Sequence, residues 1–345
     1  MSRKPSLKTV ATAAGVSPST VSNAYNRPQQ LSAELRARIL RVARDQGYAG
    51  PDAAARSLRS GRAGAIGVLF TAGLSYAFSD PYCLELLAGA AEVAETARTS
   101  LVLMPVARHE SGRSAAPYDL HDSVAAVRHA VIDGAIADGI ADDNPALRVL
   151  TDRGLPLVRS VGGQGRSVVV DEHEAAVALG RHLRELGHRR LTFVAEGEDG
   201  EALRPYVRLR LAGLRSALGA TAVTVRAAGP NTVEAGRSAA ESILRGARPT
   251  AVVASSDVLA LGVLDALRAH GMRAGYDVSV AGFDDVPAAG VAGLTTVRQP
   301  VREKGRIMAR MLLDPSFQER QVVLPTRLVV RASTGAAAAT GRSAA

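Results

Sequence analysis

Between Arg62 and Ser333 the chain alternates short apolar runs with amphipathic segments of helical spacing, and it does so in two rounds. The first round extends from GAIGVLF at residues 64–70 to LPLVRSV at 155–161. The second follows Asp171 and ends with VSVAGFD at 278–284. Strands that alternate with helices form parallel sheets covered by helices. The sequence therefore predicts an α/β body of two doubly wound parallel-sheet subdomains.

The composition favours the same fold class. Of the 345 residues, 47% are apolar but only 3% are aromatic, and tryptophan is absent. The cores must therefore be filled mainly by alanine, valine and leucine, as in parallel sheets that helices cover. A chain of this length is expected to form two or three domains.

The number of cysteines and the length of the apolar runs indicate in which cellular compartment the protein acts. Cys83 is the only cysteine, so no internal disulfide can form. No cysteine or histidine pair has zinc-site spacing, and we expect neither a metal nor another cofactor. No stretch approaches about 18 uninterrupted apolar residues, and the N-terminal residues lack the apolar segment of a signal peptide. The sequence predicts a cytoplasmic protein without a membrane partner.

The net charge of +9 is concentrated at the start of the chain. Residues 1–64 contain eleven Lys and Arg against three acidic residues, whereas the remaining 281 residues contain 31 basic and 30 acidic side chains. This asymmetry favours a small module for a polyanion, joined to a nearly neutral body. The alternative is a solvated basic tail.

Three short helices are predicted in the first 50 residues. One apolar stripe with helical spacing consists of Leu7, Val10, Ala11 and Ala14. Gly15 can end this first helix, while Ser17 as N-cap and Pro18 at the first helical position begin a second. A third helix follows from Ser32 to Gly47. Two helices joined by a tight turn suggest a helix-turn-helix, whose second helix enters the major groove of DNA.

Three blocks, SLKTVATAAGVSPSTVSNAYN, LSAELRARILRVARDQGY and AAARSLRSGRAGAIGVL, with their spacing, closely resemble the start of a lac repressor (LacI/GalR) family regulator. The resemblance implies that Pro18, Ser19 and Asn23 read base edges. It implies phosphate or further groove contacts for Ser17, Thr20, Ser22 and Asn26. Because Pro18 has no hydrogen-bond donor, sequence reading is expected to depend on Ser19 and Asn23.

Residues 51–61 contain the Ala-rich stretch DAAARSLRSG, which is too short for a stable helix alone in water. The family resemblance makes it a hinge helix that folds on the operator and inserts Leu58 into the minor groove. The residues expected beside this wedge are Ala55, Arg56 and Arg59. Asp52 replaces the usual Asn after proline. The alternative is a plain interdomain linker.

The resemblance extends to about Ala332, and its most recognisable blocks are PTAVVASSDVLALGVLDALRAHGMR, DVSVAGFDD and GLTTVRQP. It implies a small-molecule effector in the cleft between the subdomains, as parallel sheets bind ligands at the carboxyl ends of their strands. The positions carried over as ligand contacts are Tyr82, Cys83, Arg204, Tyr206, Arg210, Asn231, Ser256 and Asp284. Arg210 facing Asp284 would bind hydroxyl groups.

Two departures from the family pattern concern the effector. Asn231 stands where many sugar-sensing members place an aromatic ring, which weakens a simple hexose assignment. The loop TAGLSYAFSDPYC is longer than usual and could supply Tyr76 or Phe78 for stacking. The alternative for this loop is an ordinary surface insertion.

The predicted organisation has four parts. Residues 1–50 form the head, 51–62 the hinge, 63–333 the body and 334–345 a flexible tail. Within the body we assign 63–162 and 291–300 to the N-subdomain, and 171–285 and 301–333 to the C-subdomain. Reading a roughly palindromic operator requires two identical heads, so we expect a homodimer. The family pairs through body helices, here expected at Leu84–Thr96 and Val258–Ala269. Without leucine heptads in the tail, we expect no tail-mediated tetramer.

The function predicted is that of a ligand-responsive, sequence-specific transcription regulator, a repressor, with a sugar or related metabolite as effector. One alternative is a cytoplasmic binding protein without operator binding. Another is an enzyme acting on a sugar or nucleoside, but His173 and Glu174 lack a second histidine for a zinc-protease motif. His121 with Asp122, and His188 beside Arg189, are interpreted as surface residues or caps.

Overall fold

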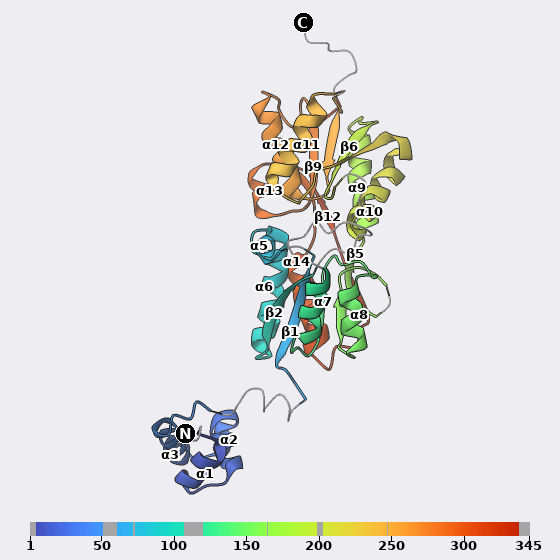
Figure 1. Cartoon of the computed structure of the whole chain (residues 1–345). Coiled ribbons are helices and arrows are strands. Elements are labelled where there is room, and N and C mark those ends of the chain that lie inside the picture. Colours follow the sequence, from blue (N-terminus) through green and yellow to red (C-terminus); the bar gives the residue numbers. More distant parts are fainter. Residues whose placement is uncertain are drawn as a thin grey trace. The chain divides into compact units, whose positions relative to one another are not determined.

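The computed structural model describes residues 5–50, 61–71, 73–106, 120–163, 165–198, 203–246 and 248–337, with only the backbone at 120–123. The chain divides into two compact units, Met1–Gly64 and Ala65–Ala345, which we call the head and the body. Figure 1 shows the helical head and the two sheets of the body. No helix among the described residues is long and apolar enough to cross a membrane.

The head contains α1 (Leu7–Ala14), α2 (Pro18–Asn26), a 3₁₀ turn (Pro28–Gln30) and α3 (Ala33–Asp45). Its helix ends confirm the capping prediction. The Ser17 side chain accepts a hydrogen bond from the Thr20 N–H, and Ser32 does the same for the third helix. Gly15 ends α1 at φ 62°, in the left-handed region that glycine favours. The buried core of the head consists of Val10, Ala11, Ala14, Val21, Ala24, Ile39 and Ala43.

The first sheet of the body is entirely parallel and has the order β11-β5-β4-β3-β1-β2. Its strands are β1 (Ala65–Phe70), β2 (Ser100–Pro105), β3 (Ala135–Ala137), β4 (Leu157–Arg159), β5 (Arg166–Val170) and β11 (Gln321–Leu324). Its helices are α5 (Leu74–Ala77), α6 (Pro81–Thr96), α7 (Leu120–His129), α8 (Pro145–Asp152) and α14 (Val301–Leu313). Helices α6 and α14 pack together, and separate apolar clusters fill the two faces of the sheet.

The second sheet has the order β12-β10-β9-β8-β6-β7 and is parallel except for β12, which pairs antiparallel with β10. Its strands are β6 (Leu191–Ala195), β7 (Val223–Ala227), β8 (Ala251–Ala254), β9 (Ser279–Asp284), β10 (Thr295–Arg298) and β12 (Arg327–Val329). Its helices are α9 (Glu172–Glu185), α10 (Pro205–Leu218), α11 (Val233–Leu244), α12 (Asp257–Ala269) and α13 (Pro287–Val291), with a 3₁₀ turn at Ala220–Ala222. The predicted fold class is confirmed.

The predicted assignment of residues 291–300 and 301–333 to the two subdomains is wrong. We expected 291–300 in the first subdomain, but β10 pairs with β9 in the second sheet. We expected 301–333 in the second subdomain, but α14 packs on α6, and β11 pairs with β5 in the first sheet. The chain therefore passes between the sheets after β5, β10 and β11. Alternation of strands and helices does not specify which sheet a strand joins, because pairing partners are distant in sequence.

His188 also differs from its prediction as a surface residue, because it is only 1% exposed. Its Nδ1 lies 3.0 Å from Thr250 Oγ1, and its Nε2 lies 2.9 Å from Ser279 Oγ and 3.1 Å from the Gly335 carbonyl. Burial lowers the pKa of this imidazole. His188 is a hydrogen-bonded core residue that ties the C-terminal segment to β9. The side chain of His121 lies outside the described residues.

Candidate functional site

The N-terminal turn of α2 forms an exposed surface of the head. Ser17, Pro18 and Ser19 are exposed, whereas Val21 and Ala24 on the opposite face of the helix are buried. Of the other predicted contacts, Asn26 is exposed, and Thr20, Ser22 and Asn23 are half-buried. The helix therefore presents its first turn to solvent, as a recognition helix must before it enters a DNA groove.

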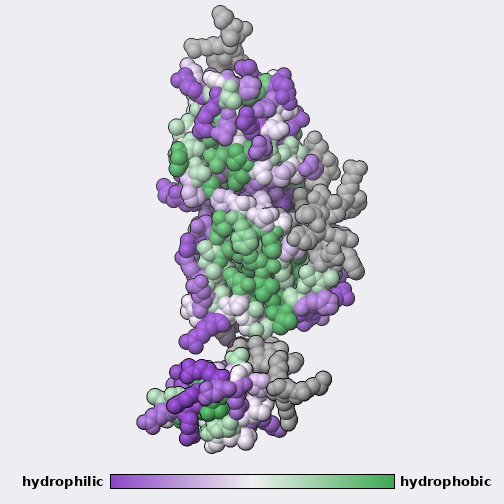
Figure 2. Space-filling model, turned by 60° about the vertical axis from the view of Figure 1, so that its left-hand side comes forward, coloured by the Kyte–Doolittle hydropathy of each residue, from purple (hydrophilic) through white to green (hydrophobic). Residues whose placement is uncertain are grey.

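Hydrogen bonds order this surface before any partner binds. Ser17 Oγ lies 2.7 Å from both Ser19 Oγ and Thr20 Oγ1. One turn later, the Asn26 amide donates to the Ser22 carbonyl at 3.1 Å. The exposed basic side chains of α3 are Arg36, Arg38, Arg41 and Arg44, and Arg36 Nε donates to the Ala24 carbonyl of α2 at 3.2 Å. Figure 2 shows that hydrophilic residues cover much of the head. The predicted hinge residues Ala55, Arg56, Leu58 and Arg59 lie outside the described residues.

The body contains a pocket between its two sheets, with an empty volume of about 900 Å³ that includes its opening to solvent. It lies at the carboxyl ends of the strands, where Asp138 follows β3, Ser160 follows β4 and Asp284 ends β9. All eight predicted effector positions line it: Tyr82, Cys83, Arg204, Tyr206, Arg210, Asn231, Ser256 and Asp284. The structure thus brings these residues together, and their contact with an effector stays a prediction.

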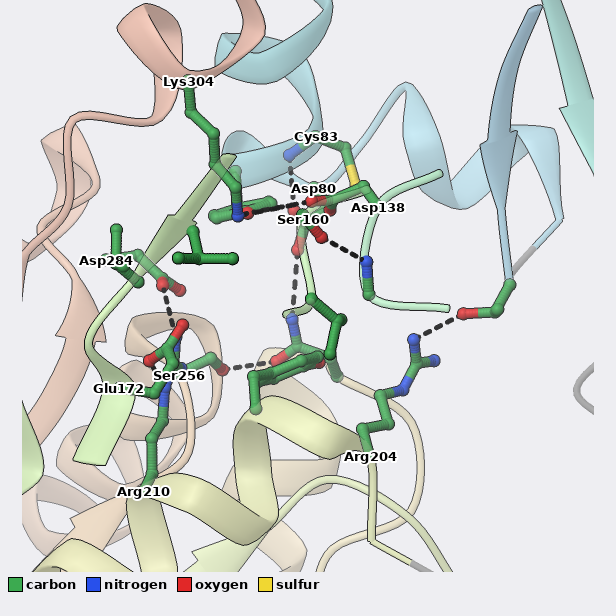
Figure 3. Close-up of a pocket in the computed structure, with 18 of the residues that line it drawn as sticks. Asp80, Cys83, Asp138, Ser160, Glu172, Arg204, Arg210, Ser256, Asp284 and Lys304 are labelled. Carbon is green, nitrogen blue, oxygen red and sulfur yellow. Dashed lines mark hydrogen bonds and ion pairs between the residues drawn. The ribbon is translucent and has the colours of Figure 1, made fainter. Parts of the chain in front are cut away.

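Arg210 lies at the base of the pocket on the side of the second sheet (Figure 3). Its Nε donates to Glu172 Oε2 at 2.7 Å, and a terminal nitrogen lies 3.7 Å from Asp284 Oδ1. Its guanidinium carbon is 4.5 Å from the centre of the Phe283 ring, close enough for a cation–π contact. Burial alone would lower the pKa of Arg210, but the negative charges of Glu172 and Asp284 have the larger combined effect and raise it above its ordinary value. Arg210 is therefore a fixed, charged donor.

Glu172, the carboxylate nearest to Arg210, was not predicted from the sequence. The segment DEHEAAV drew attention only as an incomplete zinc motif. Asp171 caps α9 directly after β5, so Glu172 begins a helix at the carboxyl end of a strand. Polar residues at the carboxyl ends of parallel strands commonly contact ligands, so the position of Glu172 directly after β5 could have identified it as a pocket residue.

Asp284 is aimed into the pocket by an unusual backbone. Asp284 and Asp285 have φ of 113° and 59°, in the region that residues other than glycine rarely adopt. The Gln299 amide donates to Asp284 Oδ1 at 2.7 Å, and Asp257 accepts from the Val286 N–H at 3.0 Å. Burial raises the pKa of Asp257 to about 7. Burial also raises the pKa of Asp284, although the positive charge of Arg210 partly counteracts this rise. Backbone strain of this kind persists only where surrounding contacts hold it.

A second polar group comes from the first subdomain. Lys304 of α14 donates to the Tyr82 hydroxyl at 2.8 Å and lies 3.4 Å from Asp138 Oδ1. Figure 3 shows this lysine entering from the side opposite Arg210. Burial is the main cause that raises the pKa of Tyr82. Lys304 was not predicted, because residues 301–333 had been assigned to the other subdomain; Asp138, which follows β3, was not predicted either.

Arg204 and Tyr206 share one carboxylate behind the pocket wall. Arg204 lies 2.9 Å from Glu196 Oε1, and the Tyr206 hydroxyl donates to Glu196 Oε2 at 2.5 Å. Arg204 also donates to Thr71 Oγ1 at 2.5 Å, across the cleft. Burial raises the pKa of the Cys83 thiol, so this cysteine stays neutral in the pocket lining.

The loop between β1 and α6 contributes one of its two expected rings. Tyr76 lines the pocket, whereas Phe78 is 60% exposed and is not part of the lining. The Tyr76 hydroxyl accepts a hydrogen bond from the Asn231 amide at 2.8 Å, and Ser256 donates to the oxygen of that amide. Asn231 thus joins the two subdomains by polar contacts.

The pocket lining contains more carboxylates than cations, because Asp80, Asp138, Glu172 and Asp284 all belong to it. Three cationic side chains line its described part, and each lies beside a carboxylate: Arg204 by Glu196, Arg210 by Glu172 and Lys304 by Asp138. Fixed charges, hydroxyls and tyrosine rings that alternate around a cavity suit a neutral ligand with many hydroxyl groups. Among the described residues, no group of His, Cys, Asp and Glu could hold a metal ion.

Comparison with known proteins agrees with both parts of the structure. Residues 6–50 match the family described as "Bacterial regulatory proteins, lacI family", and residues 181–334 match a "Periplasmic binding protein-like domain". An HTH-type transcriptional regulator of Mycobacterium tuberculosis is 38% identical, over 95% of this chain and 96% of that protein.

Solved structures of related regulators match over nearly the whole chain. The lac repressor dimer bound to operator and the anti-inducer ONPF is 25% identical, with a TM-score of 0.76, over 97% of this chain and 100% of the other. The complex of the transcriptional regulator CelR with cellobiose is 27% identical, with a TM-score of 0.66, over 95% of this chain and 99% of the other. Similarity in sequence and fold therefore covers head and body together, and the chain belongs to the LacI family of bacterial transcriptional regulators.

Proposed function

We propose that this protein is a repressor that binds a roughly palindromic DNA operator as a homodimer and releases or engages it in response to a small-molecule effector. The observation that carries the proposal is the combination, in one chain, of a basic head with an exposed α2 turn and a body with a buried polar pocket. Among the relatives, the lac repressor is a dimer on its operator, and CelR is a complex with cellobiose.

DNA recognition is assigned to the head and the hinge. Ser19 and Asn23 supply hydrogen-bonding groups to base edges, and Pro18 contributes shape or a thymine-methyl contact. Ser17, Thr20, Ser22 and Asn26 contact the backbone or the groove. Leu58 enters the minor groove between base steps, with Ala55, Arg56 and Arg59 beside it, and paired wedges from two subunits kink the central step.

Dimerisation is assigned to α6 and the adjacent edge strand β2. Beyond the residues that α6 buries against α14, a second apolar stripe with helical spacing is only partly covered: Leu84, Leu87, Ala88 and Ala91. Figure 2 shows an extended apolar area on this side of the body. The other helix predicted to pair, α12, has less uncovered apolar surface for a dimer interface. Most of its apolar side chains are buried within the body, and only Val258 and Leu261 are half-buried.

The pocket favours an uncharged effector with several hydroxyl groups, such as a sugar or a related metabolite. Arg210 and Asp284 can donate to and accept from the same hydroxyl group, and the tyrosines offer apolar faces. A phosphorylated ligand would find the cationic side chains already beside carboxylates.

Effector binding is proposed to change the angle between the two subdomains and thereby the separation of the two hinges. Hinges that are held apart cannot place both Leu58 wedges at one base step. A coupling free energy of about 1–3 kcal/mol between effector and DNA, typical of allosteric proteins, would change operator affinity by roughly 5- to 150-fold.

We further propose that the chain acts in the cytoplasm, where its DNA target lies, and that it regulates rather than catalyses. The relatives reported above are transcriptional regulators. The competing function is a binding protein whose basic head does not read DNA. It predicts effector binding without operator preference.

Replacing Leu58 by Ala tests this proposal. The operator is first obtained by selection from a pool of random duplexes, and affinity is then measured by fluorescence anisotropy. Loss of the wedge should weaken operator binding by about 10- to 100-fold, since kinking a base step depends on the apolar insertion. Leu58→Met, which keeps the apolar volume, should stay within a few-fold of the original protein.

Equal operator affinities for the Ala variant and the original chain would contradict the wedge. Failure of the selection to enrich any sequence would contradict operator binding itself and favour the competing function.

A further inference from the structure

Three side chains that line the pocket connect the two subdomains. Tyr76 and Asp80 belong to the first subdomain, and Asn231 precedes α11 in the second. The Asn231 amide nitrogen donates to the Tyr76 hydroxyl at 2.8 Å and to Asp80 Oδ2 at 3.1 Å. The Tyr76 hydroxyl in turn donates to the same Asp80 oxygen at 2.8 Å. We call Tyr76, Asp80 and Asn231 the clasp.

The hydrogen-bonding groups of the clasp are occupied. Asn231 uses both amide hydrogens within the clasp, and its oxygen accepts from Ser256 Oγ. The other Asp80 oxygen accepts from the Cys83 N–H at 2.9 Å. An effector hydroxyl could bind the Asn231 nitrogen only if a contact between the subdomains broke.

Burial makes these contacts stronger than exposed ones. Asp80 is 5% exposed and Ser256 is 6% exposed. Burial, with Asp80 and Glu196 nearby, holds the pKa of the Tyr76 hydroxyl well above its usual range, so it remains a donor. Arg204 adds a contact across the same cleft, to Thr71. Opening the cleft would leave buried polar groups without these partners, which is unfavourable.

We infer that the clasp holds the cleft closed in the absence of a ligand, and that Asn231 ties the subdomains together rather than binding the effector. This inference rests on the proposed function, in which an effector acts by changing the angle between the subdomains. The clasp then sets how often the ligand-free cleft opens, and hence how readily an effector enters and leaves. The loop ahead of α6 supplies two of its three members and so has a function beyond that of a surface insertion.

Cys83 provides a direct test, because the only cysteine of the chain lines the pocket and is 7% exposed. Its alkylation by iodoacetamide in the full-length, ligand-free protein reports the open fraction of the cleft. Tyr76→Phe and Asn231→Ala should each accelerate alkylation about fivefold, as expected for the loss of hydrogen bonds of ordinary net strength. The double variant should react no faster than Asn231→Ala alone, because that change already removes both hydrogen bonds of the clasp that cross the cleft.

Two further variants make the test specific. Phe78→Ala changes an exposed ring of the same loop and should react at the original rate. Asn231→Asp keeps the side-chain size but sets a second carboxylate against Asp80, so it should accelerate alkylation more than Asn231→Ala. A cooperative thermal unfolding transition in each variant, with a midpoint lowered by no more than about 2–4 °C, shows that the cleft, and not the whole body, has opened.

Alkylation of both Asn231 variants at the original rate would overturn the inference. Acceleration by Tyr76→Phe alone, or an equal effect of Phe78→Ala, would also overturn it, since these results indicate local loosening of the loop. Because the assay uses neither DNA nor effector, its failure is distinguishable from failure of the proposed function.

Discussion

Operator binding should weaken by a factor of about 10³ to 10⁵ between about 50 and 200 mM salt, as for proteins that make about 6–10 phosphate contacts. The reason is the charge of the head, where eleven Lys and Arg face three acidic residues in the first 64 positions. The described basic side chains there are exposed, including Lys8, Arg27 and the four arginines of α3. Each neutralised phosphate releases a counterion, and added salt opposes that release. Fluorescence anisotropy with a labelled operator at four or five salt concentrations gives the slope.

A matched pair of variants locates the effect. Lys8→Ala removes an exposed charge of the head and should reduce the slope if that lysine contacts a phosphate. Arg226→Ala removes an exposed charge from β7 of the body and should leave the slope unchanged. An affinity that does not change with salt would contradict the role of the basic head.

Replacing Arg210 by Met should lower the free energy of unfolding by about 3–5 kcal/mol, the usual cost of removing one partner from a buried ion pair. The side chain is 3% exposed, and its loss would leave Glu172 and Asp284 close together without a cation. Urea unfolding followed by circular dichroism measures the change. The same variant should lose effector binding, because the fixed donor at the base of the pocket is gone.

Two comparisons separate charge from packing. Arg215→Met lies on the exposed face of the same helix and should change stability by no more than about 0.5 kcal/mol. Adding Glu172→Gln to Arg210→Met removes one of the two uncompensated carboxylates and should recover part of the loss. A stability loss in Arg210→Met no larger than in Arg215→Met would contradict the ion-pair role.

The features that the sequence predicted correctly depend on local chemistry. Gly15, Ser17 and Ser32 end or begin helices as expected, because caps act over three or four neighbouring residues. The strand and helix runs of the body follow from apolar spacing for the same reason. The eight effector positions came from family resemblance, and the structure places all of them around one pocket.

The features that were missed depend on contacts distant in sequence. Lys304 reaches the pocket only because α14 packs against α6, about 210 residues earlier in the chain. Glu172 becomes the partner of Arg210 because β5 joins the first sheet and directs α9 beneath the pocket. The tie between Asn231 and Tyr76 spans both subdomains. Periodicity along the chain carries no information about such pairings.

The central claim is that the head reads a DNA sequence, and its most direct test is anisotropy titration of the full-length protein with two duplexes. One is the fragment obtained by selection, and the other is a scrambled duplex of the same length and composition. We predict a preference of at least about 10³-fold for the selected fragment in one effector state, as is usual for specific DNA binding. Equal affinity for both duplexes, with and without added sugars and nucleosides, would contradict the claim.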